Sequence, residues 1–139
     1  MRVLIDSSAW IDFLNDFPSP HAAEVERLVK SDDEVCTCGL VALEVLQGLR
    51  RSSSFPEAQA MFEELTLLEP AGLETYLVAA RLYAALRRGG KTLRSAVDCV
   101  VLALADEHRC WVLARDRDIE AILESGELPN VQAWPLPHG

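Results

Sequence analysis

The chain has 139 residues, of which 50% are hydrophobic and 25% are charged, a composition typical of one globular domain. Its formal net charge of -9 argues against a protein that coats nucleic acid non-specifically. The longest apolar run, residues 99–105, is too short to span a membrane, and residues 1–5 lack the apolar core of a secretory signal, so we expect a cytoplasmic protein without a membrane partner.

The chain opens with a short apolar run, residues 3–5, that predicts a strand buried on both faces. Asp6 follows it directly. In open α/β sheets, ligands bind beyond the carboxyl ends of the strands, so we expect Asp6 to lie where chemistry is done. A helix over residues 7–14 comes next. Asp6 could cap this helix, but Ser7 or Ser8 could do so instead, which would leave Asp6 free for a site.

Helices and strands alternate through the middle of the chain. The pattern predicts, in order, a helix over 21–30, a strand over 34–38, a helix from 39 to about 51, a helix from 56 to about 64 and a strand over 66–68. In the first of these helices, Glu24, Glu26 and Arg27 are expected to face outward. The four cysteines of the chain are expected to be reduced core residues, because their spacing does not complete a zinc site.

The second half of the chain continues this alternation. The pattern predicts a helix over 73–88, a helix from 95 to about 107, a strand over 111–114, a helix over 119–124 and a last strand around 131–134. In the helix over 73–88, Leu77, Ala80, Tyr83 and Ala84 are expected to face the core. The alternation implies an α/β three-layer sandwich, with a mostly parallel central sheet of about five short strands and helices on both faces.

Two acids of the predicted helices have apolar surroundings. Glu44 has apolar neighbours on both sides, and Asp98 lies in the most apolar helix of the chain. A buried carboxylate must be paired or bind a metal, or its pKa must rise. Without a site, Glu44 would pair with Arg50, Arg51 or Arg94, and Asp98 would only favour the start of its helix through its charge.

The fourth strand ends in acids, as the first strand does. We expect one of Asp116 and Asp118 to bind a ligand and the other to cap the next helix, and we favour Asp116 as the ligand because it is nearer the strand end. The carboxyl ends of parallel strands meet at one edge of a sheet. Asp6, Glu44, Asp98 and Asp116 can therefore reach one crevice.

Carboxylates that cluster in this way require a counter-charge. Two carboxylates about 5 Å apart repel by about 3 kcal/mol at an effective dielectric constant of 20. A ligand set made only of oxygens suits Mg²⁺ or Mn²⁺ better than zinc. Such a cation can support water attack on a phosphodiester, which predicts a nuclease.

A stretch without acids, residues 75–97, carries several basic side chains. Those expected to contact the phosphates of an RNA are Arg87, Arg88, Lys91 and Arg94. The alternative is an ordinary solvated helix face.

Four parts of the chain, in this order, resemble the PIN domain family. They are residues 3–11, the isolated Glu44, the start of a helix at 93–98 and the segment 116–119. The chain length and the opening segment are similar to those of the VapC toxins of bacterial toxin–antitoxin pairs. The resemblance implies a single PIN-like domain over residues 1–139.

The resemblance also implies a function, a Mg²⁺- or Mn²⁺-dependent endoribonuclease acting on RNA. Its implied acidic site residues are Asp6, Glu44, Asp98 and Asp116. In similar sequences the hydroxyl after the first Asp can join the metal shell, which here is Ser7. Where the family often has Thr or Ser two residues before the fourth acid, this chain has Ala114. A homodimer and inhibition by a cognate antitoxin are implied as well.

Two other functions compete with this hypothesis. A phosphatase with Asp6 as nucleophile would need a second Asp two residues on, where this chain has Ser8. A non-catalytic module would bind Mg²⁺ with the same acids and cleave nothing.

Overall fold

Four parallel strands form the centre of the computed structural model, which describes residues 1–137. The strands are β1 (Arg2–Ile5), β2 (Glu34–Thr37), β3 (Thr66–Leu67) and β4 (Trp111–Leu113). They pair in the order β3-β2-β1-β4, and every pairing is parallel. The first strand of the chain is therefore an inner strand of the sheet.

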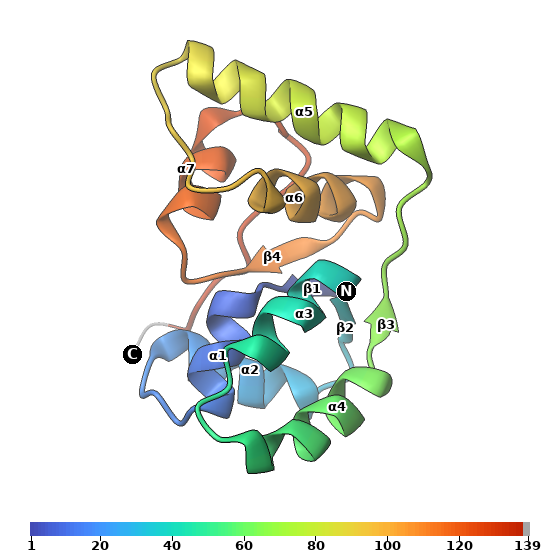
Figure 1. Cartoon of the computed structure of the whole chain (residues 1–139), viewed down its shortest axis with the longest axis vertical. Coiled ribbons are helices and arrows are strands. Elements are labelled where there is room, and N and C mark those ends of the chain that lie inside the picture. The colour runs from blue at the N-terminus through green and yellow to red at the C-terminus, as the bar shows by residue number, and fades with distance from the viewer. Residues whose placement is uncertain (138–139) are drawn as a thin grey trace.

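Helices connect the strands on both sides of the sheet. Within residues 1–137 they are α1 (Ser7–Leu14), α2 (Pro20–Val29), α3 (Gly39–Gln47), α4 (Phe55–Glu63), α5 (Leu73–Arg88), α6 (Val97–Glu107) and α7 (Arg117–Ser125), with a 3₁₀ turn at Ser52–Ser54. Figure 1 shows α5, α6 and α7 in the upper half of the molecule and α1 to α4 in the lower half, with the strands between them. The predicted three-layer α/β arrangement is confirmed. Over this part of the chain, every helix is too short or too polar to serve as a membrane span.

The strand order reverses at β1. The first two crossovers move outward to β2 and β3, and the connection through α5 and α6 then returns the chain to the other side of β1. Beyond the paired residues, the backbone amide of Asp6 donates to the carbonyl oxygen of Leu113 at 2.9 Å. The carboxyl ends of β1 and β4 therefore lie side by side at the point where ligands bind in open α/β sheets.

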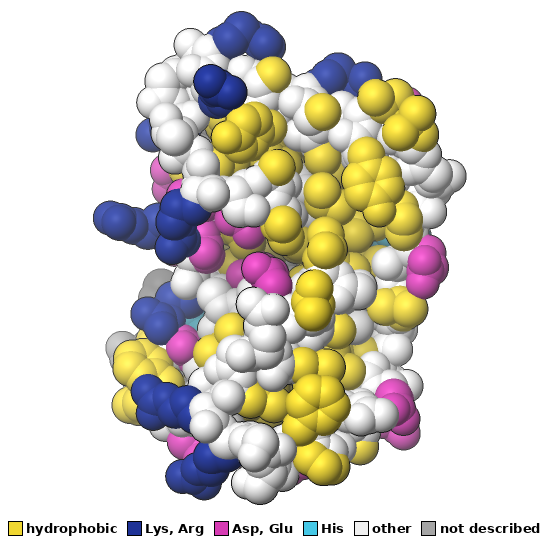
Figure 2. Space-filling view, in the orientation of Figure 1, with side chains coloured by type: hydrophobic (Ala, Val, Ile, Leu, Met, Phe, Trp, Pro, Cys, Tyr) yellow, Lys and Arg dark blue, Asp and Glu magenta, His cyan; other side chains and the backbone are white. Residues whose placement is uncertain are grey.

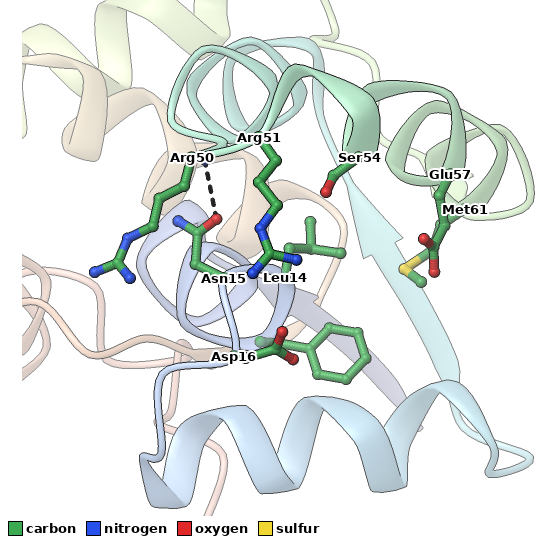
Figure 3. Close-up of a pocket in the computed structure, with 9 residues that line it drawn as sticks. Leu14, Asn15, Asp16, Arg50, Arg51, Ser54, Glu57 and Met61 are labelled. Carbon is green, nitrogen blue, oxygen red and sulfur yellow. Dashed lines mark hydrogen bonds between the residues drawn. The ribbon is translucent and has the colours of Figure 1, made fainter.

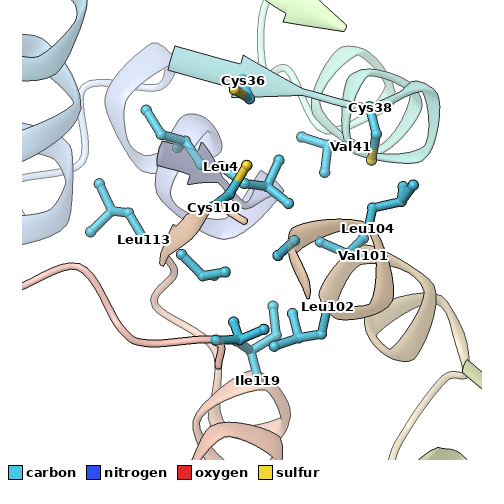
Figure 4. Packing of buried hydrophobic residues seen from close by; sticks show 14 of the residues in the cluster. Leu4, Cys36, Cys38, Val41, Val101, Leu102, Leu104, Cys110, Leu113 and Ile119 are labelled. Atoms are coloured by element: carbon cyan, nitrogen blue, oxygen red, sulfur yellow. The ribbon is translucent and has the colours of Figure 1, made fainter. Parts of the chain in front are cut away.

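The core is formed where the strands meet α3, α6 and α7. Because Leu4 pairs with Val112 and Leu113 pairs with Ile5, Leu4 and Leu113 point to opposite faces of the sheet. Figure 4 shows Leu113 directed away from the helix residues Val41, Leu102 and Ile119. All of these side chains are at most 1% exposed. The four cysteines are free and buried, which confirms the sequence-based expectation. Because its neighbours surround it, α6 is a rigid support for the acid in its first turn.

The segment expected as a last strand, residues 131–134, forms a single parallel bridge between Ala133 and Val112. Two backbone hydrogen bonds join it to β4, from Val112 to Gln132 and from Trp134 to Val112. Pro135 follows and has no amide hydrogen with which to extend the ladder. The sheet therefore has four strands in the described residues.

The buried face of α5 differs from the expected one. Thr75, Ala79, Leu82 and Leu86 are buried, whereas Leu77 is 41% exposed. The hydroxyl of Thr75 binds the carboxylate of Glu107 on α6. This hydrogen bond fixes the rotation of α5, so the expectation was wrong for Leu77 and for Ala80, which is also exposed.

The outward orientation expected for Glu24 is also wrong. Its side chain is 2% exposed, and it accepts hydrogen bonds from Arg27 and from the indole of Trp134. Trp134 lies 110 positions away in the chain, so the partner that covers Glu24 could not be found from the pattern of α2 alone.

Candidate active site

Asp6 stands at the end of β1, where the chain turns into α1. Its side chain caps α1, and Oδ2 accepts hydrogen bonds from the amide of Ser8 at 3.1 Å and from the Ser8 hydroxyl at 2.8 Å. Asp6 itself therefore caps α1, whereas the sequence had also allowed Ser7 or Ser8 to take this role. Burial raises the pKa of Asp6. Its other oxygen, Oδ1, is buried and has no hydrogen-bond partner among residues 1–137.

Glu44 reaches the same region from α3. Its Oε1 accepts a hydrogen bond from the Ser7 hydroxyl at 3.2 Å. Burial raises the pKa of Glu44, and the negative charges of Asp6 and Asp116 raise it further. Through the Ser7 hydroxyl, Glu44 is therefore connected to the segment that directly follows Asp6.

The alternative partners of Glu44 lie elsewhere. Figure 3 shows Arg50 and Arg51 at a pocket formed with the end of α1 and with α4. This pocket has a volume of about 280 Å³, and its wall also includes Asp16 and Glu57. The backbone amide of Arg50 donates to Oδ1 of Asn15 at 3.1 Å. Among the described residues, no salt bridge joins Glu44 to an arginine.

Asp98 lies in the first turn of α6 and faces the other acids. Carboxylate oxygens of Asp98, Asp116 and Asp118 lie within 4.8 Å of one another. The pKa of Asp98 is raised to about 7, first by burial and then by the charges of Asp116, Asp6 and Glu44. The structure therefore places the carboxylates of Asp98 and Asp116 together, and it brings Asp6 and Glu44 near enough for their charges to act on Asp98.

Asp116 and Asp118 divide their tasks differently from the expectation. Asp116 caps α7, because its Oδ1 accepts hydrogen bonds from the amides of Asp118 at 2.8 Å and Ile119 at 3.2 Å. Asp118 instead accepts hydrogen bonds from the amide and from Nε of Arg94, both at 3.1 Å. Asp116 and Asp118 both belong to the acidic cluster. The helix cap is Asp116, the residue that the sequence favoured as the ligand.

The basic residues of the window 75–97 have different surroundings. Arg94 lies against the acids, with Nη2 at 3.0 Å from Oδ2 of Asp116. Arg87 and Arg88 are exposed in the last turn of α5, and Lys91 is exposed beyond it. Figure 2 shows acidic side chains near the middle of this face, with basic side chains along its left edge and at its top.

Sequence reasoning missed two further arginines at the site. A hollow of about 490 Å³ beside the acids is lined by Thr92, Arg94, Arg115, Asp116, Arg117 and Asp118. Arg115 and Arg117 alternate with the two acids directly after β4. This alternation at the end of a predicted strand was the signal that could have identified them.

The acids suit a hard divalent cation. The cluster offers carboxylate oxygens as donors, which Mg²⁺ and Mn²⁺ prefer. Oδ1 of Asp6 is a buried oxygen without a partner in the described chain, and such an atom costs free energy unless a ligand satisfies it. The raised pKa of Asp98 reflects its burial first and then the negative charge of the neighbouring acids, which a bound cation would compensate.

Comparison with known proteins gives a consistent result. The PIN domain family matches residues 3–123. Ribonuclease VapC11 of Mycobacterium tuberculosis (strain ATCC 25618 / H37Rv) is 32% identical over 132 residues, which are 94% of this chain and 96% of the relative.

Two solved structures share the fold. VapBC-1 of nontypeable Haemophilus influenzae has a TM-score of 0.69 at 14% identity, over 96% of this chain and 97% of that one. VapC20 of Mycobacterium tuberculosis, a sarcin–ricin loop cleaving toxin, has a TM-score of 0.62 at 18% identity, over 86% of this chain and 93% of that one. The family match over residues 3–123 and the 32% identity over 94% of the chain show that the chain belongs to the PIN domain family.

Proposed function

We propose that the chain is a divalent-metal-dependent endoribonuclease that acts as the toxin of a toxin–antitoxin pair. The observation that carries this proposal is the acidic cluster, in which carboxylate oxygens from α6 and from the start of α7 lie within 4.8 Å of one another. The similarity to VapC ribonucleases over 94% of the chain supports RNA as the substrate.

In this proposal, the residues that hold a Mg²⁺ or Mn²⁺ ion are Asp6, Glu44, Asp98 and Asp116, with Ser7 and Asp118 beside them. When bound, such an ion stabilises negative charge on a phosphoryl group and lowers the pKa of a water molecule. Oδ1 of Asp6 is free to bind a cation because Oδ2 takes both capping hydrogen bonds.

The basic residues position the RNA. Arg94 and Arg117 line the hollow beside the acids, so their guanidinium groups can contact the phosphates that flank the reacting one. Arg87 and Arg88 in the last turn of α5 and Lys91 just beyond it supply further exposed basic side chains. Guanidinium groups fixed near the reacting phosphate also stabilise the negative charge that develops on it.

Two protein partners belong to the proposal. The first is a cognate antitoxin, supported by the fold shared with VapBC-1 and with the toxin VapC20. The second is another copy of the chain. The exposed apolar side chains of α5, with Leu73 at 71%, Tyr76 at 49% and Leu77 at 41% exposure, support a homodimer. We expect the toxin to act in the cytoplasm, on the RNA found there.

The geometry of Asp6 argues against the phosphatase alternative. The residue two positions on, Ser8, donates to Asp6 and carries no carboxyl group that could act as an acid or base. Oδ1 of Asp6 is also buried, which suits a ligand of a cation better than a nucleophile that must be exposed to its substrate.

The test is a cleavage assay with purified protein freed of any bound antitoxin. A panel of structured and single-stranded RNAs is incubated with Mg²⁺, Mn²⁺ or EDTA, and the wild type is compared with Asp6→Asn and Asp98→Asn. We expect metal-dependent cuts that both variants lose. Mn²⁺ binding without any cleavage would instead support the non-catalytic binding module.

A further inference from the structure

A partly buried ion pair joins α1 to the loop after β4. Nε and Nη2 of Arg115 donate to Oδ2 and Oδ1 of Asp12 at 2.6 and 2.9 Å. The Asp12 side chain is 7% exposed, and its Oδ2 also accepts a hydrogen bond from the Ser19 hydroxyl at 2.9 Å. On the other side, the guanidinium lies 4.9 Å from the ring centre of Phe17. The Arg115 side chain is therefore held by two residues of the N-terminal region, Asp12 and Phe17, and Ser19 orients Asp12.

A second connection runs from the backbone of Arg115 to Asp6. The amide of Arg115 donates to the Ser8 hydroxyl oxygen at 2.9 Å, and this hydroxyl donates to Oδ2 of Asp6 at 2.8 Å. A serine hydroxyl has a single hydrogen, so accepting from Arg115 directs that hydrogen toward Asp6. The orientation of the Asp6 carboxylate thus depends on where Arg115 is held.

Arg115 also precedes Asp116 in the chain. Holding Arg115 against Asp12 therefore fixes the backbone that presents Asp116, while Ser8 fixes Asp6. We propose that Ser8 and the Arg115–Asp12 pair are positioning residues, which hold the carboxylates of Asp6 and Asp116 at the spacing that a divalent cation requires. This inference rests on the proposed function, in which these acids bind the cation.

The competing explanation is that the ion pair only stabilises the fold. The chain offers a matched control for it. Nε and Nη2 of Arg27 donate to Oε1 and Oε2 of Glu24 at 2.7 and 2.8 Å. The arginine and carboxylate side chains are 51% and 2% exposed in this pair, against 47% and 7% in the Arg115–Asp12 pair. The hydrogen bonds of Glu24 lead to Trp134 and not to an acid of the site.

The experiment measures Mn²⁺ binding by calorimetry and thermal unfolding in EDTA, without RNA. The variants are Arg115→Gln, Arg27→Gln, Ser8→Ala and Ser8→Thr. Both arginine variants should lower the melting temperature to a similar extent. Only Arg115→Gln and Ser8→Ala should weaken Mn²⁺ binding, by about tenfold or more, as is usual when residues that orient metal ligands are removed. Ser8→Thr keeps the hydroxyl and should restore most of the affinity.

The outcomes separate this inference from the proposed function. Wild-type Mn²⁺ affinity in Arg115→Gln and Ser8→Ala would overturn the positioning role while leaving the nuclease proposal intact. An equal loss of affinity in Arg27→Gln would also overturn it, because general destabilisation would then be the cause. A wild-type chain that binds no Mn²⁺ would contradict the proposed function itself, and the inference with it.

Discussion

The hydroxyl of Ser7 donates to Oε1 of Glu44 at 3.2 Å, so the first turn of α1 meets the middle of α3 at a carboxylate. These two helices follow the neighbouring strands β1 and β2. The hydrogen bond keeps Glu44 turned toward the other acids. The oxygen lone pairs of Ser7 remain available, since its one hydrogen is used.

Glu44→Gln should show whether the site needs the negative charge of Glu44 or only the shape and hydrogen bond of its side chain. The amide oxygen of Gln can still accept the hydrogen bond from Ser7, but the negative charge is lost. Because burial and neighbouring acids raise the pKa of Glu44, its charged form opposes folding, and the variant should be as stable as the wild type or more stable. RNA cleavage should nevertheless fall by at least about tenfold, as expected when a charge at a metal site is removed.

Urea unfolding in EDTA and cleavage rates with Mn²⁺ check this prediction. Glu57→Gln is a suitable control, since Glu57 is exposed on α4 and lines the pocket near Arg50 and Arg51. Unchanged cleavage by Glu44→Gln would exclude Glu44 from the site.

The raised pKa of Asp98 predicts opposite effects of pH on stability and on metal binding. Its carboxyl group has a pKa of about 7, against an ordinary value of 3.8. The stabilisation that it contributes is fully present below the ordinary value and is lost as the pH rises through 7. Metal binding needs the carboxylate, so Mn²⁺ affinity should increase over the same range, by up to about tenfold per pH unit below 7.

Unfolding in EDTA and Mn²⁺ titrations between pH 5.5 and 8, a range chosen around the value of about 7, test this prediction. The relevant quantity is the difference between the wild type and Asp98→Asn, because the lowered pKa of His21 acts on stability in the opposite direction. A difference that does not change with pH would show that Asp98 does not titrate in this range.

Two substitutions of Asp116 should distinguish its capping role from its role in the site. Asn caps helices about as well as Asp, whereas Ala does not, and losing a cap costs about 1 kcal/mol. Asp116→Asn should therefore keep the free energy of unfolding, and Asp116→Ala should lower it by about that amount. Both should lose metal-dependent cleavage. Full cleavage by Asp116→Asn would mean that Asp116 only caps α7.

Arg94→Gln should affect RNA binding more than stability. Its side chain is 74% exposed, and salt bridges of such exposed residues contribute little to stability. Arg81→Gln is the matched control, because Arg81 forms a 3.0 Å salt bridge with Glu74 and is 65% exposed. Only Arg94→Gln should weaken RNA binding and reduce its dependence on salt concentration. Equal salt dependence in both variants would argue against a phosphate contact by Arg94.

Much of the fold could be predicted from local pattern. Short apolar runs identified β1, β2 and β4, and the alternation with helices implied the parallel sheet. Errors arose where a distant residue decides the outcome. Thr75 fixes the rotation of α5 through Glu107, and Trp134 covers Glu24. Neither partner lies within the segment whose pattern was being interpreted.

In the candidate site, too, local sequence pattern located some residues, whereas side-chain geometry and distant partners decided the rest. Asp6 and Asp116 could be located because each follows a buried strand, and Asp98 because its helix is apolar. Which residue caps a helix depends on side-chain geometry, so the tasks of Asp116 and Asp118 could not be assigned. The Arg115–Asp12 pair joins residues 103 positions apart, and no spacing rule identifies such a pair.

The place of β1 inside the sheet determines when the site can form. β1 is synthesised long before its partner β4, and the hydrogen bond from Arg115 to Ser8 spans 107 positions. Contacts of such long range form late in folding, because a large loop must first close. A growing chain on the ribosome therefore carries Asp6 and Glu44 without Asp116. The assembled site arises only after β4 and the start of α7 have been synthesised, so the acids cannot act as a group before that point.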